Sequence, residues 1–206
     1  QGLLTDPASL ETYGCDWTKT YEPAPSAIAF PKTTAQVQAL IQVANQAQFN
    51  IVPSGGRTGL SGGAVAAQGE LVVSLERMNK ILEFNTQDRS VTCEAGVITA
   101  QIQQFAAEHD LFYPVDFASA GSSQIGGNIA TNAGGIKVIR YGLTRQQVLG
   151  LVVVTGKGEI LKLNNGLVKN ATGYDLRHLF IGSEGTLGII TQATLQLIRP
   201  PQNLTV

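Results

Sequence analysis

The sequence has few of the residues that build disulfide frameworks or metal centres. Its 206 residues include only two cysteines, Cys15 and Cys93, and two histidines, His109 and His178. The cysteines are far apart and form no Cys-x-x-Cys pair, so a disulfide framework or a structural zinc site is not expected. Two histidines are too few to complete a metal cluster with them. We therefore predict two reduced thiols, no bound metal ion and a cytoplasmic type of protein.

Basic clusters and long apolar stretches are also missing. There are 14 Lys and Arg residues against 15 Asp and Glu residues, which gives a net charge of −1. This balance argues against nucleic acid as a partner. No apolar run approaches the roughly 18–20 residues that a membrane helix needs, so no integral membrane segment is expected. The N-terminus shows neither a signal-peptide pattern nor an initiator Met, and we expect a part of a longer protein.

Glycine is what the sequence has in excess, and ten of its 23 glycines lie in two loops. The first loop runs from Pro53 to Gly63 and the second from Ala120 to Gly135. Glycine allows positive φ and carries no Cβ that would hold a ligand away from the backbone. Successive N–H groups of such a loop can form a concave nest for a phosphate.

Polar side chains accompany the glycines of the second loop. Asn128 and Asn132 contribute amides, and Ser122, Ser123 and Thr131 contribute hydroxyl groups. Together, the two loops predict a long ligand with a diphosphate and polar rings, held from both ends. A dinucleotide fits this description.

Hydrophobic periodicity predicts a mixed α+β fold. Helices are expected to begin near Thr34 and Thr99, with each threonine as the N-cap. Short strands are expected at residues 49–52, 71–75, 81–84, 90–94, 149–155, 159–163 and 187–198, with a hairpin turn at 156–158. Two lobes with the ligand between them are the simplest arrangement, because pockets favour such interfaces.

Two other motifs point to different chemistry and are disfavoured, and a third is missing. Gly59-Leu-Ser-Gly-Gly63 formally fits the nucleophile elbow of hydrolases, with Ser61 as nucleophile, but the elbow must enter a helix and here a loop is expected. Gly150–Lys157 resembles a Walker A loop, yet it has five residues between its glycines and Gly158 replaces the Ser/Thr. No Gly-x-Gly-x-x-Gly follows a strand and opens a helix, which argues against a Rossmann site.

A third glycine-containing segment, residues 182–191, leaves two interpretations open. Gly182, Gly185 and Gly188 can serve only a turn and a bulge before the final strand. Alternatively, small residues at 185 and 188 would let the Leu187–Ile190 backbone lie against a flat ring system. The residues themselves favour neither interpretation.

Four stretches together resemble the FAD-binding (PCMH-type) domain of the vanillyl-alcohol oxidase/p-cresol methylhydroxylase superfamily. They are residues 55–63, 125–135 continuing to 140–142, 172–175 and 182–191, in the family's order and spacing. Within the superfamily, the sequence is most similar to the D-2-hydroxy-acid dehydrogenases, a group that includes D-2-hydroxyglutarate dehydrogenase, D-lactate dehydrogenase and the flavin subunit of glycolate oxidase.

The resemblance implies two α/β subdomains with FAD in the groove between them. Residues 1–22 would form an N-terminal extension, 23–88 the first FAD-binding subdomain and 89–200 the second. Residues 201–206 would begin a linker to a C-terminal substrate-binding cap domain.

The resemblance also implies which residues bind the cofactor. The loop Gly55–Gly63 would hold the FAD diphosphate, Pro114 and Gly121–Gly135 would line the path of the ribityl and adenosine groups, and Gly188–Ile190 would contact the cofactor through backbone atoms. The cofactor-binding residues expected on this basis are Pro53, Gly55, Gly56, Arg57, Thr58, Gly59, Ser61, Gly62, Gly63, Pro114, Gly121, Ser122, Ile125, Gly126, Gly127, Asn128, Thr131, Asn132, Gly135, Tyr141, Gly142, Gly188, Ile189 and Ile190.

Non-covalent FAD is expected from the same comparison. In relatives with covalently attached flavin, a histidine can follow the first Gly-Gly pair of the loop. This sequence has Arg57 at that place and no cysteine in the second loop.

The resemblance places catalysis outside this sequence. The cap domain of relatives supplies the active-site histidines, any metal-binding residues and the arginines that grip the substrate carboxylate, so no catalytic residue is assigned here. We expect the FAD-binding part of an enzyme that oxidises a small D-2-hydroxy acid to the 2-oxo acid and passes electrons to a separate acceptor, through which it would contact a membrane peripherally. The alternative is a non-catalytic FAD-binding or electron-transfer subunit that docks on a catalytic partner.

Overall fold

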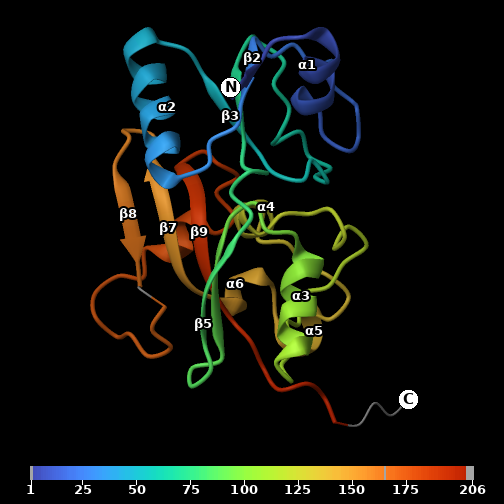
Figure 1. Cartoon of the computed structure of the whole chain (residues 1–206), viewed down its shortest axis with the longest axis vertical. Coiled ribbons are helices and arrows are strands. Elements are labelled where there is room, and N and C mark those ends of the chain that lie inside the picture. Colours follow the sequence, from blue (N-terminus) through green and yellow to red (C-terminus); the bar gives the residue numbers. More distant parts are fainter. Residues whose placement is uncertain (1, 165, 203–206) are drawn as a thin grey trace.

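The computed structural model describes residues 2–164 and 166–202. It contains two β-sheets, one above the other in Figure 1, with helix α2 (Thr34–Ala47) lying beside both. Helices α3 and α5 lie at the lower right of the same view. The mixed α+β class predicted from the sequence is confirmed.

The first sheet is mostly parallel and has the strand order β1-β2-β4-β3. β2, β4 and β3 run parallel, and β1 is an antiparallel edge strand. β4 is buried at every position, as expected for an inner strand covered on both faces. The first glycine loop leaves the carboxyl end of β3, the edge at which open α/β sheets bind ligands. The strands are β1 (Leu3–Leu4), β2 (Ala27–Ala29), β3 (Ile51–Ser54) and β4 (Leu71–Ser74).

The second sheet is antiparallel, with the order β5-β6-β9-β7-β8. β9 is the central strand and pairs with β6 on one side and with β7 on the other. The turn at residues 156–158 joins β7 to β8, so the predicted hairpin is confirmed and the Walker A interpretation is wrong. The strands are β5 (Ile81–Asn85), β6 (Ser90–Glu94), β7 (Val148–Thr155), β8 (Ile160–Leu163) and β9 (Gly188–Gln196).

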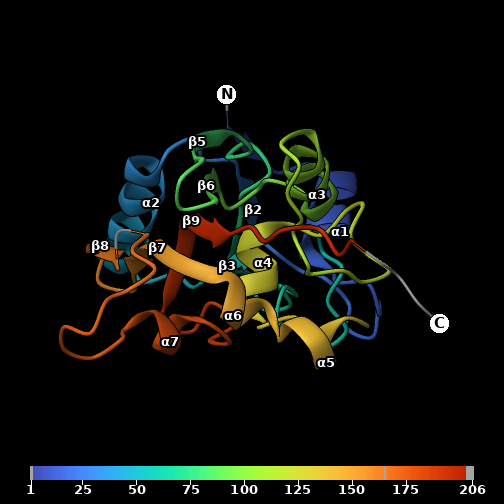
Figure 2. The ribbon, with the colours of Figure 1, turned by 90° about the horizontal axis from the view of Figure 1, so that it is seen from below.

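Of the remaining helices, α1 packs against β2 and β4 of the first sheet, while α3 and α4 pack against the second sheet. Ile102 of α3 and Ile125 and Ile129 of α4 are fully buried in the core cluster of the second sheet. Figure 2 shows α5, α6 and α7 in a row along one side of the molecule. The helices are α1 (Pro7–Gly14), α3 (Thr99–Glu108), α4 (Ile125–Ala130), α5 (Val138–Tyr141), α6 (Thr144–Gln147) and α7 (Arg177–Phe180).

Helix α2 joins the two sheets into one body. Its buried residues Val37 and Ile41 belong to a core cluster that also contains Val154 of β7 and Ile189 of β9. Its polar side also reaches the second sheet, because Gln38 Nε2 donates to the Gly158 carbonyl at 2.7 Å. The packing of α2 against both sheets therefore holds the two sides of the groove in position relative to each other.

Both helix starts predicted from threonines are displaced by one residue. Thr33, not Thr34, caps α2 and accepts the Gln36 N–H at 3.2 Å. Ile98 occupies the N-cap position of α3, where its N–H donates to Gln101 Oε1 at 2.9 Å. Thr34 and Thr99 are thereby freed for tertiary hydrogen bonds, Thr34 with Thr191 of β9 at 3.0 Å.

The sheets divide the chain differently from the expected subdomains. Leu3–Leu4, placed in the N-terminal extension, pairs with β2 of the first sheet. Ile81–Asn85, placed in the first subdomain, pairs with β6 of the second sheet. The division at residues 22 and 88 stays a prediction, and residues 203–206 of the expected linker lie outside the described residues.

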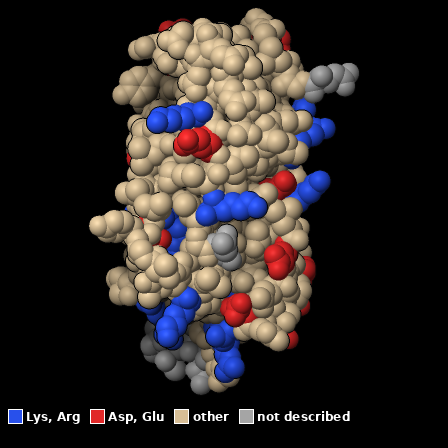
Figure 3. Space-filling model, turned by 90° about the vertical axis from the view of Figure 1, so that its left-hand side faces the viewer, with Lys and Arg blue, Asp and Glu red and all other residues tan. Residues whose placement is uncertain are grey.

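Charged side chains of both signs are interspersed over most of the face shown in Figure 3. Uncharged residues cover the greater part of that face, in keeping with the low charged fraction of the sequence. Within the described ranges, no helix is both long and apolar enough to cross a bilayer.

The two thiols differ sharply in their surroundings. Cys93 lies in β6, has no exposed surface and belongs to the core cluster of the second sheet. Burial opposes ionisation and raises the pKa of the Cys93 thiol to about 12, with a smaller contribution from the Glu94 charge. Cys15 is half-buried at the end of α1.

We expect only one thiol of the folded protein to react with a thiol reagent at neutral pH. The thiolate is the reactive form, and Cys93 neither ionises nor meets the reagent until the fold opens. Titration with Ellman's reagent should give one rapid equivalent, and a second equivalent only after denaturant is added. The variant Cys15→Ser should show no rapid equivalent. Two thiols reacting at similar rates in the native protein would contradict the buried position of Cys93.

Candidate functional site

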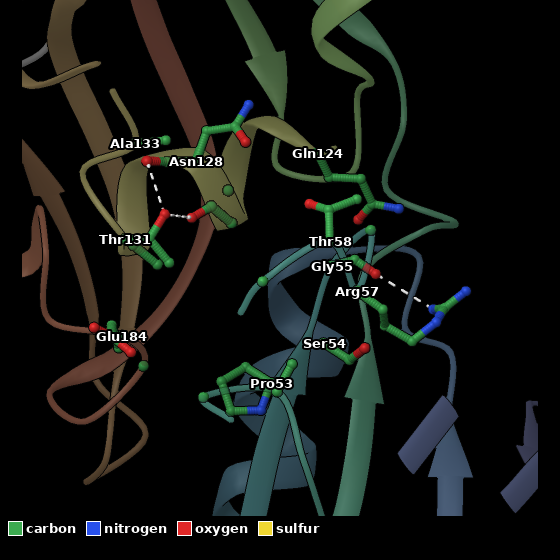
Figure 4. A pocket seen from close by; sticks show the side chains of 18 of the residues that line it. Pro53, Ser54, Gly55, Arg57, Thr58, Gln124, Asn128, Thr131, Ala133 and Glu184 are labelled. Atoms are coloured by element: carbon green, nitrogen blue, oxygen red, sulfur yellow. Dashed lines mark hydrogen bonds between the residues drawn. The ribbon is translucent and has the colours of Figure 1, made fainter. Parts of the chain in front are cut away.

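The two glycine loops converge on one cavity of about 480 Å³, within the usual range for small-molecule sites. Three segments supply most of its wall, namely residues 53–64 after β3, residues 124–134 around α4, and residues 184–190 at the start of β9. Figure 4 shows Pro53, Ser54 and Gly55 on one side and Thr131 and Glu184 on the other. The cavity therefore lies between the first sheet and the second.

Most of the residues expected to bind the cofactor line this cavity. They are Pro53, Gly55, Gly56, Arg57, Thr58, Gly59, Ser61, Gly63, Gly126, Gly127, Asn128, Thr131, Asn132, Gly188, Ile189 and Ile190. The third glycine segment thus meets the two loops at a single site. This arrangement favours the ligand-facing interpretation of Gly188–Ile190 over one limited to a turn and bulge.

The other expected residues lie outside the cavity wall. Ile125 is buried in the core, and Tyr141 packs its ring against Phe112 with 5.9 Å between the centroids. The Gly62 N–H is already bound to the carboxylate of Asp16 at 2.8 Å. Those that do not line the cavity are Gly62, Pro114, Gly121, Ser122, Ile125, Gly135, Tyr141 and Gly142.

Several lining residues are not among the 24 that were named from the sequence as cofactor-binding. Glu184 and Gly185 belong to the third glycine segment, whose glycines were noticed while the acidic residue was not. Gln124 lies within the stretch Gly121–Gly135 that was expected to line the path of the ribityl and adenosine groups, although it was not named individually. The additional lining residues are Ser54, Leu60, Ala64, Leu75, Ala95, Phe117, Ser119, Gln124, Ala130, Ala133, Gly134, Glu184 and Gly185.

Gly56 marks the closest approach of the two loops. A Cβ on this residue would lie 2.2 Å from the Ser122 carbonyl oxygen, a separation that real Cβ atoms do not show. The absence of a side chain at position 56 thus sets how closely the first loop can lie against the second.

The first loop keeps backbone donors available for a ligand. Among the described residues, none accepts a hydrogen bond from the N–H groups of Gly55, Gly56, Thr58 or Gly59. Arg57, which lies between them, has a φ of 55°, so the backbone of the loop is in the left-handed region at this residue. Such changes of backbone hand turn successive N–H groups into an anion-binding concavity.

The polar side chains of the second loop mainly hold that loop in place. Asn128 Nδ2 donates to Thr99 Oγ1 at 2.6 Å, and Thr99 Oγ1 also bonds to Ser123 Oγ at 2.8 Å. Asn132 Oδ1 accepts the Arg145 N–H at 3.1 Å, and Thr131 Oγ1 donates to the Gly127 carbonyl at 3.0 Å. The amides and hydroxyl groups expected to address the ligand thus also fix the backbone around α4.

The two charged residues of the wall are arranged differently. The Arg57 guanidinium lies over the Tyr13 ring, 4.4 Å from its centroid, and Figure 4 shows its side chain directed away from Asn128 and Thr131. Glu184 lies on the opposite side, with Oε2 2.9 Å from where a Cβ on Gly63 would be. A carboxylate there accepts hydrogen bonds from hydroxyl groups and repels phosphate.

Two buried polar atoms of the wall lack a partner within the described chain, Ser54 Oγ and Gln124 Oε1. Ser54 is 1% exposed and Gln124 is 8% exposed, so leaving these atoms without hydrogen bonds is costly. A bound ligand with hydroxyl or amino groups would satisfy them. Together with the free N–H groups of the first loop and the apolar surface of Leu75, Ile189 and Ile190, they suit a ligand such as FAD.

The structure offers no support for a hydrolase built on Ser61. Ser61 lies in the loop between β3 and β4, with no helix after it, so the nucleophile elbow is absent there. His109 Nδ1 bonds to the Phe105 carbonyl and His178 Nδ1 to Arg145. Neither imidazole bonds to the Ser61 hydroxyl, so that interpretation is wrong.

Comparison with known proteins agrees with the cavity. Residues 25–164 match the family model described as FAD binding domain, and this span contains both glycine loops. Among solved structures, alkyldihydroxyacetonephosphate synthase superposes with a TM-score of 0.87 at 24% identity, covering 98% of this chain and 38% of that chain. This likeness establishes the fold alone.

Curated relatives are similar along almost the whole chain. D-2-hydroxyglutarate dehydrogenase of Stutzerimonas stutzeri (strain A1501) is 66% identical over 203 residues, which are 98% of this chain and 44% of the relative. The Xanthomonas citri pv. viticola protein of that name is 62% identical over 199 residues, 97% of this chain and 42% of the relative. The mitochondrial protein of Danio rerio is 40% identical over 203 residues, 98% of this chain and 38% of the relative.

The chain thus spans less than half the length of these relatives. The family model covers more than half of the chain and includes both loops of the cavity wall. The resemblance noted in the four motifs is confirmed, and the chain belongs to the family of FAD-binding domains, with FAD as its cofactor.

Proposed function

We propose that this chain is the FAD-binding part of a dehydrogenase that oxidises D-2-hydroxyglutarate to 2-oxoglutarate. The observation that carries the proposal is the convergence of two glycine loops on one cavity, in a chain 66% identical to a protein named D-2-hydroxyglutarate dehydrogenase. Removal of two electrons and two protons from the 2-hydroxy acid gives the 2-oxo acid, and a separate acceptor takes the electrons onward. Bound FAD supplies the two-electron redox chemistry.

The residues of this chain bind and orient the cofactor in this proposal. The free N–H groups from Gly55 to Gly59 hold the diphosphate, while Ile189 and Ile190 offer an apolar surface to a flat ring. Glu184 and Gln124 accept hydrogen bonds from hydroxyl groups. Of the 24 residues expected from the sequence, 16 line the cavity and the other eight lie outside its wall.

The cofactor is held without a covalent bond. Flavin attachment needs a nucleophilic side chain, and the residues lining the cavity include no histidine, cysteine or tyrosine within the described ranges. Cys93 is buried in the core of the second sheet, away from the wall. Arg57, at the place of the attaching histidine in some relatives, turns toward Tyr13.

The partner proposed is the remainder of a longer polypeptide, because the curated relatives are more than twice as long. α5 and α7 carry exposed apolar side chains, of which Ile139 is 99% and Leu179 is 58% exposed. α6 connects the other two, since Arg145 donates to the His178 carbonyl and Gln147 to the Tyr141 carbonyl. Exposed apolar surface of this kind is typical of an interface. We propose that a substrate-binding domain covers it.

The catalytic groups belong to that further domain. Arg57 and Glu184 are the charged residues of the described wall. No observed contact of either residue gives it a role in catalysis. The greater length of the relatives also favours a domain of one long enzyme over an independent electron-transfer subunit.

Activity should require the longer polypeptide. We expect FAD-loaded 206-residue chain to show no turnover, and the longer polypeptide to reduce an artificial electron acceptor with D-2-hydroxyglutarate but not with the L-enantiomer. Limited proteolysis should cut the α5–α7 region more slowly in the longer polypeptide, because a second domain covers it. Turnover by the 206-residue chain alone, or indifference of the longer enzyme to D-2-hydroxyglutarate, would contradict the proposal.

Acid should release the cofactor from the protein. We expect trichloroacetic acid to precipitate a colourless protein and leave the yellow flavin in the supernatant, since only non-covalent contacts hold it. The absorbance of the supernatant at the flavin maximum measures the released fraction. A yellow pellet after washing would show a covalent link.

Gly56→Ala should weaken FAD binding about tenfold or more. The new Cβ would meet the Ser122 carbonyl and push the loops apart, and overpacking of this kind costs about 1–3 kcal/mol. Gly121→Ala is the matched control, because a Cβ there meets nothing within 4 Å and the residue does not line the cavity. Isothermal titration with FAD should separate the two variants, and equal affinities would refute the close approach.

A further inference from the structure

We propose that the segment Tyr13–Trp17 is a brace that holds the first glycine loop in its binding conformation, with Asp16 as its positioning residue. The proposal deepens the FAD-binding function and rests on it. The brace lies outside residues 25–164, the span that matches the family model. A part of the chain that had been expected only as an N-terminal extension thereby becomes part of the cofactor site.

The brace contacts the loop at several points along its length. The Asp16 carboxylate accepts the Gly62 N–H at 2.8 Å, and the Gly59 carbonyl accepts the Trp17 N–H at 3.2 Å. Just beyond the loop, the Ala66 N–H donates to the Gly14 carbonyl at 2.9 Å. Two backbone–backbone hydrogen bonds and one hydrogen bond to the Asp16 side chain thus join the brace to the loop and the residues just after it.

A contact between two side chains holds the beginning of the loop against the brace. The Arg57 guanidinium lies 4.4 Å from the centroid of the Tyr13 ring. Tyr13 is itself fixed, because its hydroxyl donates to Glu76 and its ring packs edge-on against Phe30 at 5.1 Å. Arg57 therefore anchors the loop to the brace.

Asp16 is built to hold this position. It is 2% exposed, and its other carboxylate oxygen accepts both the N–H and the hydroxyl of Thr18, at 3.0 and 2.7 Å. Burial opposes its ionisation, but the hydrogen bonds from Thr18 and from the Gly62 N–H outweigh burial and keep the pKa of Asp16 below its ordinary value. A buried carboxylate that accepts hydrogen bonds from all these donors holds the backbone at Gly62 firmly in place.

The brace matters for binding because of the composition of the loop. Five glycines between residues 55 and 63 give the free loop many conformations, and ordering them costs free energy when a ligand binds. Contacts that fix the loop beforehand remove part of that cost. The brace uses the Gly62 N–H and leaves those of Gly55 to Gly59 for the cofactor, so it orders the loop without occupying its binding groups.

Asp16→Ala should raise the Kd of FAD about tenfold, since a charge-assisted hydrogen bond to the loop is lost. The matched control is Asp6→Ala. Asp6 is also an aspartate of the N-terminal segment that accepts a backbone N–H, from Ser9 at 3.0 Å, but it caps α1 and lies outside the cavity wall. We expect the control to lower thermal stability and to leave the Kd within about twofold.

The measurement combines FAD titration with hydrogen–deuterium exchange of the FAD-free 206-residue chain. Asp16→Ala should speed exchange in residues 55–66, whereas Asp6→Ala should not. Tyr13→Leu, which removes the Arg57 contact, provides a second variant and should act in the same direction if Asp16→Ala fails to fold. An unchanged Kd in both brace variants, or an equal rise in the Asp6→Ala control, would overturn the proposal.

The outcomes also separate the brace from the proposed function. If the unaltered chain does not bind FAD, the proposed function fails, while the exchange data still decide whether the brace orders the loop. If it binds FAD and the brace variants bind equally well, the brace alone is refuted.

Discussion

The site depends on how closely two stretches of polypeptide backbone can approach each other. At Gly56 the first loop lies so near the Ser122 carbonyl that no side chain fits between them. This contact fixes the distance between the first glycine loop, which follows β3 of the first sheet, and the second glycine loop, which leads into α4 on the second sheet. The cavity of about 480 Å³ is the space that remains beside it.

The distance between the two loops stays constant only because the two sheets are also packed together elsewhere. Val37 and Ile41 of α2 pack with Val154 and Ile189 in one buried cluster, so the helix bridges the two sheets. Thr34 adds a hydrogen bond to Thr191 in the central strand of the second sheet. Relative movement of the sheets would break this packing, and interiors packed in this way resist small displacements.

Glycine-rich loops combine an advantage with a cost. They expose backbone donors to a phosphate, but their freedom in the unbound state opposes binding. In this chain, side chains around the loops offset that freedom. Asn128 and Thr99 order the second loop, and the N-terminal residues Tyr13 and Asp16 contact the first. Many polar side chains near the site therefore hold the backbone in its conformation. The backbone N–H groups of the first loop remain available to bind the ligand.

The sequence by itself determined the local structure and the kind of ligand. Hydrophobic patterns located α2, α3 and the main strands to within a few residues, because such patterns follow burial, on one face of the helices and on both faces of β4. The density of glycine between residues 53 and 63 indicated a phosphate nest, since a missing Cβ is a property of the residue itself. The four motifs in their order then identified the FAD-binding family.

Only the tertiary structure decided which groups point where. Asn128, Asn132 and Thr131 were suited by type to address a ligand, yet their hydrogen bonds run to neighbours that fold next to them. Glu184 lines the wall because the start of β9 and α4 converge there, which no local pattern encodes. The contact between Asp16 and Gly62 joins residues 46 positions apart, and such long-range pairing depends on the packing of the whole chain rather than on any one segment.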